Sequence, residues 1–132
     1  NQEPDCSASS ASVDEIWPAN HKFVAVNILR ITDPDEDPIT VNILSIFQDE
    51  PLNHLADGNT EVDGRGLLTA TAEVRAERSA QGDGRFYHIT FGADDGQGGT
   101  CMGVVTVAVP HDQGKKAAPP VDQGPMFDST GP

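Results

Sequence analysis

Residues 85–109, with the sequence RFYHITFGADDGQGGTCMGVVTVAV, decide the fold of this chain. In the first nine residues, Tyr87, Ile89 and Phe91 lie on one face of an extended chain, and the side chains between them lie on the other. A glycine-rich turn follows, and the next ten residues alternate in the same way. One face of that second segment contains Cys101, Gly103, Val105, Val107 and Val109. Alternation with a period of two on both sides of a turn predicts two strands of a sheet.

Further strand patterns occur on the N-terminal side of this pair. They cover residues 11–16, 22–31, 39–47 and 68–78. Helix signals are nearly absent, and clusters of Gly, Pro or Asp bound the segments. The alternation in the third segment breaks after Ile43, which fits either a β-bulge or a strand buried on both faces. Six or seven such strands predict an all-β fold, an immunoglobulin-like antiparallel β-sandwich of about seven strands.

The composition changes after Pro110. We expect residues 1–110 to form the sandwich and residues 111–132 to form an extended, Pro/Gly-rich C-terminal tail or linker. Such a segment is expected to be held by its own domain or by a neighbouring subunit, and strand addition to a sheet edge is one way of holding it. The chain starts without Met or a signal peptide, so we expect a processed or excised fragment.

The charge balance restricts the partners of this chain. Its 132 residues include 8 basic and 21 acidic residues, which gives a net charge of −13. A duplex or an anionic membrane repels such a surface, so we expect no nucleic-acid partner. We also expect no membrane insertion, because no apolar run approaches the roughly 20 residues of a membrane helix. Bound divalent cations would relieve the self-repulsion of so acidic a chain.

Two cysteines, Cys6 and Cys101, lie almost a whole domain apart. They are either two free buried thiols or a disulfide that joins the N-terminal segment to a late strand. In a chain-entropy treatment, closing a loop of about 100 residues contributes up to roughly 4 to 5 kcal/mol. The even cysteine count, the scarcity of Lys and Arg, and the abundance of Asp, Gly and Thr favour an oxidising compartment.

The acidic run Asp33-Pro34-Asp35-Glu36-Asp37-Pro38 connects two predicted strands. Its carboxylates alternate at i, i+2 and i+4, and its prolines keep the backbone out of a helix. Dense oxygen ligands in a stiff turn suit Ca²⁺, which takes six to eight oxygens. The alternative is a solvated loop whose Asp side chains only stabilise the turn.

A second acidic turn, at Asp94 and Asp95, follows another strand and is expected to close on the same ion. The candidate ligands of a calcium site are therefore Asp33, Asp35, Asp37, Asp94 and Asp95.

No pattern in the sequence indicates an enzyme. Paired carboxylates serve in glycoside hydrolysis, but here each acidic cluster lies in an open turn with no sign of an apolar pocket to raise a pKa. The four histidines are scattered without zinc-type spacing, and nucleophile-elbow, phosphate-loop and dinucleotide motifs are absent.

Three motifs carry a family resemblance. Residues 16–22 (IWPANHK), 33–38 (DPDEDP) and 91–100 (FGADDGQGGT) resemble motifs of repeated extracellular bacterial modules of immunoglobulin-like or cadherin-like character. With residues 109–113, they cover most of residues 5–113. The resemblance implies a β-sandwich, a secreted or cell-surface location and calcium at inter-strand turns. It implies no reaction, because such modules serve as spacers, adhesive units and assembly domains.

Two residues depart from the pattern of that family, and the smaller change is Ala19, where the pattern often has a second Pro. Glu36 occupies the position at which the family has Gly, a residue that adopts a positive φ at little cost. Glu36 is therefore expected either to add a ligand or to distort the turn.

Together these observations predict a non-catalytic extracellular structural or interaction module, stiffened by Ca²⁺. We expect it to act as a surface repeat, adhesin unit or filament subunit that contacts neighbouring domains or copies of itself through a docking terminal segment. The alternative is a carbohydrate-binding module of a larger secreted protein, with polysaccharide as the partner and Trp17, the single tryptophan, as the test position.

Overall fold

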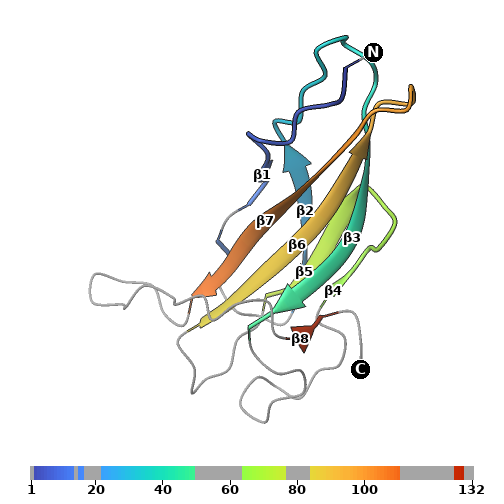
Figure 1. Cartoon of the computed structure of the whole chain (residues 1–132). Coiled ribbons are helices and arrows are strands. Elements are labelled where there is room, and N and C mark those ends of the chain that lie inside the picture. Colours follow the sequence, from blue (N-terminus) through green and yellow to red (C-terminus); the bar gives the residue numbers. More distant parts are fainter. Residues whose placement is uncertain are drawn as a thin grey trace.

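The chain folds as an all-β sandwich, as the alternation predicts (Figure 1). The computed structural model describes residues 2–13, 15–16, 22–49, 64–76, 84–110 and 127–129. Within these ranges the regular structure consists of strands, in two antiparallel sheets of four. No helix that is long and apolar enough to cross a membrane occurs in this part of the chain.

Each sheet has a strand order typical of an immunoglobulin-like sandwich. The first sheet has the order β1 (Ser10–Ala11), β2 (Phe23–Leu29), β5 (Thr71–Arg75), β4 (Gly64–Arg65). The second has the order β7 (Thr100–Pro110), β6 (Gly84–Asp94), β3 (Thr40–Gln48), β8 (Phe127–Asp128).

The strands β6 and β7 form a long hairpin in the second sheet, with β7 at the sheet edge and β6 between β7 and β3. The register of this hairpin runs without interruption from Gly84 opposite Pro110 to Asp94 opposite Thr100. The predicted alternation is confirmed, because Tyr87, Ile89 and Phe91 share the buried face of β6 and are fully buried. On β7, residues 105, 107 and 109 are valines that are almost or completely buried. The core therefore lies between the buried faces of β3, β6 and β7 in the second sheet and those of β2 and β5 in the first.

A β-bulge explains the broken alternation in β3. The pairing of β3 with β6 shifts register between Ile43 and Ser45, so one extra residue stands in β3. Ile43 and Ile46 are both fully buried, whereas Leu44 between them is 41% exposed. The bulge, rather than burial on both faces, is therefore the correct alternative.

The N-terminal strand region changes sheets. Ser10 and Ala11 pair with β2 in the first sheet, whereas Glu15 forms a parallel bridge to Ala108 of β7 in the second. The Ile16 amide also donates to the Ala108 carbonyl at 2.8 Å. The segment predicted as one strand over residues 11–16 therefore contacts both layers.

A buried tyrosine joins the two layers near the start of β6. The Tyr87 hydroxyl donates to the Arg75 carbonyl at the end of β5 at 2.8 Å, and it accepts from Nη1 of the buried Arg85 at 3.0 Å. This arrangement resembles the tyrosine corner of immunoglobulin-like sandwiches, in which a tyrosine near the start of a strand hydrogen-bonds back to the preceding backbone.

Candidate metal centre

The first acidic turn forms a compact loop between β2 and β3. Asp33 Oδ1 accepts the amide of Asp35 at 2.7 Å, and the Asp33 carbonyl accepts the amide of Glu36 at 3.0 Å. These two bonds reverse the chain within four residues. As a result, the side chains of alternate aspartates converge.

Three of the predicted ligands are brought together in this loop. Asp33, Asp35 and Asp37 each offer a carboxylate oxygen, and these three oxygens lie within 4.8 Å of one another. The second oxygen of Asp33, Oδ2, is buried and has no hydrogen-bond partner in the described part of the chain. A buried carboxylate oxygen without a donor is costly, and a cation at this position would satisfy it.

The electrostatics of the loop also favour a cation. The pKa of Asp37 is raised above its ordinary value of 3.8, first by desolvation and then by the charges of Asp33, Asp95 and Asp35 in decreasing order. The influence of Asp95 shows that the second acidic turn contributes to the same negative field. Without a counter-ion, these carboxylates repel one another in the folded state.

The second acidic turn uses its two carboxylates differently. Asp94 is exposed, and its Oδ1 accepts the amide of Gly96 at 2.7 Å, within its own turn. Asp95 is only 1% exposed, and its Oδ1 accepts the amides of Gln97 at 2.7 Å and Gly99 at 3.0 Å. Neither residue belongs to the three-carboxylate group, although Asp95 acts on Asp37 electrostatically.

The N-terminal segment contacts the acidic loop, which sequence reasoning did not predict. The backbone amide of Gln2 donates to Asp35 Oδ2 at 2.6 Å. Asp5 and Thr32 exchange two backbone hydrogen bonds. The sulfurs of Cys6 and Cys101 lie at disulfide distance, with Cα atoms 6.0 Å apart. Figure 1 shows this segment beside the β2–β3 connection and the β6–β7 turn at one end of the sandwich. The only signal in the sequence was the position of Cys6, five residues from the start.

Glu36 occupies its unusual position without breaking the turn. It has a φ of 60°, the left-handed conformation that Gly adopts freely, and its side chain is exposed. It is not one of the three grouped carboxylates. Glu36 therefore adds backbone strain to the loop.

Glu36→Gly is expected to raise the free energy of unfolding by about 0.5 to 1 kcal/mol, because relief of the left-handed strain exceeds the added entropy of the unfolded chain. Urea unfolding in EDTA measures the change. Glu36→Ala is the matched control, since it removes the same charge and keeps the Cβ atom. Equal gains in both variants would assign the effect to charge and contradict the strain argument.

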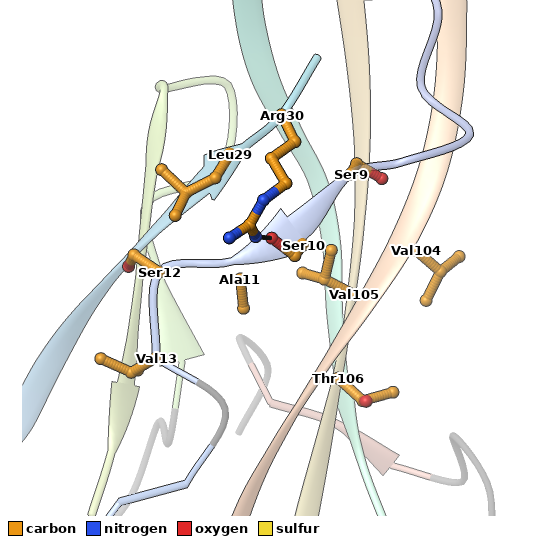
Figure 2. Close-up of a pocket in the computed structure, with 10 residues that line it drawn as sticks. All are labelled: Ser9, Ser10, Ala11, Ser12, Val13, Leu29, Arg30, Val104, Val105 and Thr106. Carbon is orange, nitrogen blue, oxygen red and sulfur yellow. Dashed lines mark hydrogen bonds between the residues drawn. The ribbon is translucent and has the colours of Figure 1, made fainter.

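Apart from the acidic turns, a pocket lies between the two sheets at β1 and β7. It has a volume of about 520 Å³ and is lined by residues 9–13, Leu29, Arg30 and residues 104–106. Figure 2 shows the Arg30 side chain reaching across to Ser10, to which its Nη1 donates a hydrogen bond. The lining contains no carboxylate, histidine or aromatic side chain, so it offers neither an acid–base pair nor a stacking platform for a sugar. Trp17, the residue of the carbohydrate hypothesis, lies outside the described residues.

Comparison with known proteins agrees with the fold and motifs described above. No curated protein and no solved structure gave a significant match. A family model described as a bacterial Ig domain (Big_9) matches residues 1–108, which include both acidic turns and strands β1 to β6 with most of β7. The match covers most of the chain, and the chain therefore belongs to the bacterial Ig domain family.

Proposed function

We propose that this chain is a calcium-stiffened, non-catalytic structural module of a secreted or cell-surface bacterial protein. The observation that carries the proposal is the group formed by Asp33, Asp35 and Asp37, with Asp33 Oδ2 buried and without a hydrogen-bond donor. In this role the module serves as a surface repeat, adhesin unit or filament subunit that contacts neighbouring domains or copies of itself. Membership of the bacterial Ig domain family supports the structural part of the proposal.

The position of the acidic loop explains how an ion would stiffen the module. The loop joins one sheet to the other, and it contacts the N-terminal segment through Gln2 and Asp5. Asp95, which acts on Asp37 electrostatically, belongs to the turn between β6 and β7. Asp33, Asp35 and Asp37 would hold the ion, and its charge would remove the repulsion among these segments. Bound Ca²⁺ would thereby fix the end of the sandwich to which the N-terminal segment leads.

Ca²⁺ is expected to stabilise the folded protein against heat. An ion that binds only the folded state adds about 2.7 kcal/mol at 100 times its dissociation constant, which is roughly 10 °C in Tm for a domain of this size. The measurement is thermal unfolding of the oxidised protein in EDTA and in millimolar Ca²⁺, with Mg²⁺ as the control ion. An unchanged Tm would make the acidic loop a solvated turn.

Asp37→Asn distinguishes a specific site from general charge screening in the same experiment. In EDTA this variant should be more stable than the wild type, because it removes a carboxylate whose pKa is raised first by desolvation and then by the neighbouring aspartates. In Ca²⁺ it should gain less than the wild type, because it lacks one ligand. Glu36→Gln is the matched control, since it removes an equal charge from the same loop and leaves the three carboxylates in place. Equal Ca²⁺ responses in the two variants would indicate screening alone.

The pH dependence without metal follows from the raised pKa of Asp37. Because the folded state holds this proton more tightly, stability falls as pH rises from 3.8 through the raised pKa, and it is constant above. Asp37→Asn should remove this part of the pH profile.

A further inference from the structure

Part of the segment predicted as a tail is a strand of the sandwich. Phe127 and Asp128 form β8, which pairs with Gln48 and Phe47 at the edge of β3. Figure 1 shows β8 beside the end of β3, at the opposite end of the molecule from the acidic loop. The strand therefore covers an edge that β3 would otherwise leave open.

The residue after β8 connects the two sheets. The Ser129 amide donates to the Ile46 carbonyl of β3 at 2.8 Å, and the Gly64 amide of β4 donates to the Ser129 carbonyl at 2.9 Å. Ser129 is fully buried as a result. We call this place, formed by the facing edges of β3 and β4, the β3–β4 seam.

The β3–β4 seam is shaped for this segment. A Cβ atom added to Gly64 would lie 3.0 Å from Ser129 Cβ and 3.0 Å from Ile46 Cγ2, so the absence of a side chain at Gly64 makes room for the segment. The seam binds residues 127–129 through backbone hydrogen bonds to both sheets and through close packing at Gly64. Binding of this kind, in which an extended segment joins a sheet edge, is a recurrent mode of association between chains.

We propose that the β3–β4 seam is a strand-acceptor site, and that residues 127–129 of a second copy of the chain occupy it in exchange for its own. This inference rests on the proposed function, in which the module acts through contacts with copies of itself. A second copy presents the same segment, so the exchanged arrangement keeps every hydrogen bond of the seam. Exchange of identical elements is a low-cost route to assembly for that reason.

The spacing along the chain permits exchange. Sixteen residues, 111–126, separate β7 from β8. A chain of this length reaches up to about 50 Å when extended. A tether of this length would hold the chain's own segment near the seam at an effective concentration on the order of millimolar. The segment therefore occupies its own seam in dilute solution, and exchange becomes substantial when copies are crowded to comparable concentrations.

Disulfide trapping across the seam tests the exchange in the full chain. Phe47 and Asp128 are directly opposed in the register, so Phe47→Cys and Asp128→Cys in one chain should form an intramolecular bond in dilute solution. When the two single variants are mixed, a covalent heterodimer requires the segment of one copy in the seam of the other. Its yield should rise about tenfold with each tenfold increase in concentration towards millimolar.

Two controls make the result specific. Thr40→Cys, at the other end of β3, mixed with Asp128→Cys gives the background of random collision. Gly64→Ala narrows the seam for the segment of either copy, so it should weaken the intramolecular Phe47→Cys/Asp128→Cys bond and the heterodimer alike, whereas Gly92→Ala should weaken neither, because its added Cβ atom meets nothing closer than 3.5 Å. A heterodimer yield no higher than the Thr40 background at 1 mM would overturn the proposal.

The calcium and exchange proposals fail separately. Loss of the Ca²⁺-dependent rise in Tm with heterodimer trapping intact would reject the metal site alone. Trapping at background with the Ca²⁺ response intact would reject strand exchange alone. The same samples provide both readouts, because the acidic loop and the seam lie at opposite ends of the sandwich.

Discussion

Loss of the Cys6–Cys101 disulfide is expected to lower the free energy of unfolding by about 4 to 5 kcal/mol, the largest effect of any change considered for this chain. The two cysteines are 95 residues apart, so the bond closes nearly the whole sandwich into a loop. Most of the effect arises in the unfolded state, which becomes much less restricted when the bond is absent. Urea unfolding of the Cys6→Ala/Cys101→Ala double variant, compared with the oxidised wild type, measures the loss.

The disulfide should also control the end of the sandwich that contains the acidic loop. Without it, the N-terminal segment is held there by local contacts, chiefly the two Asp5–Thr32 hydrogen bonds and the Gln2–Asp35 bond. Hydrogen exchange at the amides of Asp5 and Thr32 should therefore be faster in the double variant, while amides of the β6–β7 hairpin change only with global stability. The reduced wild type is the control. A loss below about 1 kcal/mol would contradict the loop-entropy argument.

The sequence was sufficient to predict the layers of the fold because each central strand has one buried face. On β5, Ala72 and Val74 are fully buried while Glu73 and Arg75, on the other face, are only partly buried, as the alternation predicts. A shift of one residue would place the charged side chains in the core, so the pattern strongly restricts the register.

Features that depend on distant pairing were not predictable in the same way. The N-terminal strand region contacts both sheets, and β8 joins β3, yet both involve only a few residues with no alternation of their own. Phe23 is a further example. Its strand pattern does not show that its ring contacts two guanidinium groups, with Arg65 Cζ 4.0 Å and Arg75 Cζ 4.3 Å from the ring centroid. Contacts of this kind arise from neighbouring strands that are far apart in sequence.

The candidate metal site was partly predictable for a simple geometric reason. Asp33, Asp35 and Asp37 belong to one tight turn, so their convergence follows from local sequence. The different environments of Asp94 and Asp95 follow from alternation along β6, which places residues 87, 89, 91 and 93 inward. Extending that alternation by one step places Asp95 inward and Asp94 outward, in agreement with their exposure. The contribution of Gln2 to the loop had no such signal.

Truncation of Phe91 to Ala is expected to lower the free energy of unfolding by about 3 to 5 kcal/mol, an effect second only to loss of the disulfide. Phe91 is fully buried in the C-terminal half of β6, and its ring lies over Gly103 of β7, its partner in the register. A Cβ atom added at Gly103 would lie only 2.7 Å from Phe91 Cζ. Phe91→Ala therefore leaves a large cavity. Gly103→Ala instead overfills the same space and should lower the free energy of unfolding by about 1 to 3 kcal/mol. Urea unfolding of both variants gives the two values.

Combining changes of opposite sign in volume tests whether these two residues share one space. Phe91→Leu replaces the ring by a smaller side chain, and Gly103→Ala adds a methyl group opposite it. The double variant should therefore be more stable than the sum of the two single effects predicts, by about 0.5 to 3 kcal/mol. Gly92→Ala combined with Phe91→Leu is the control, because the added methyl group at Gly92 approaches Leu44 and the Cys101 carbonyl instead. Strict additivity for the Phe91–Gly103 pair would show that the backbone moves to accommodate each change independently. Glycine at position 103 would then be explained by strand geometry and not by the ring that it faces.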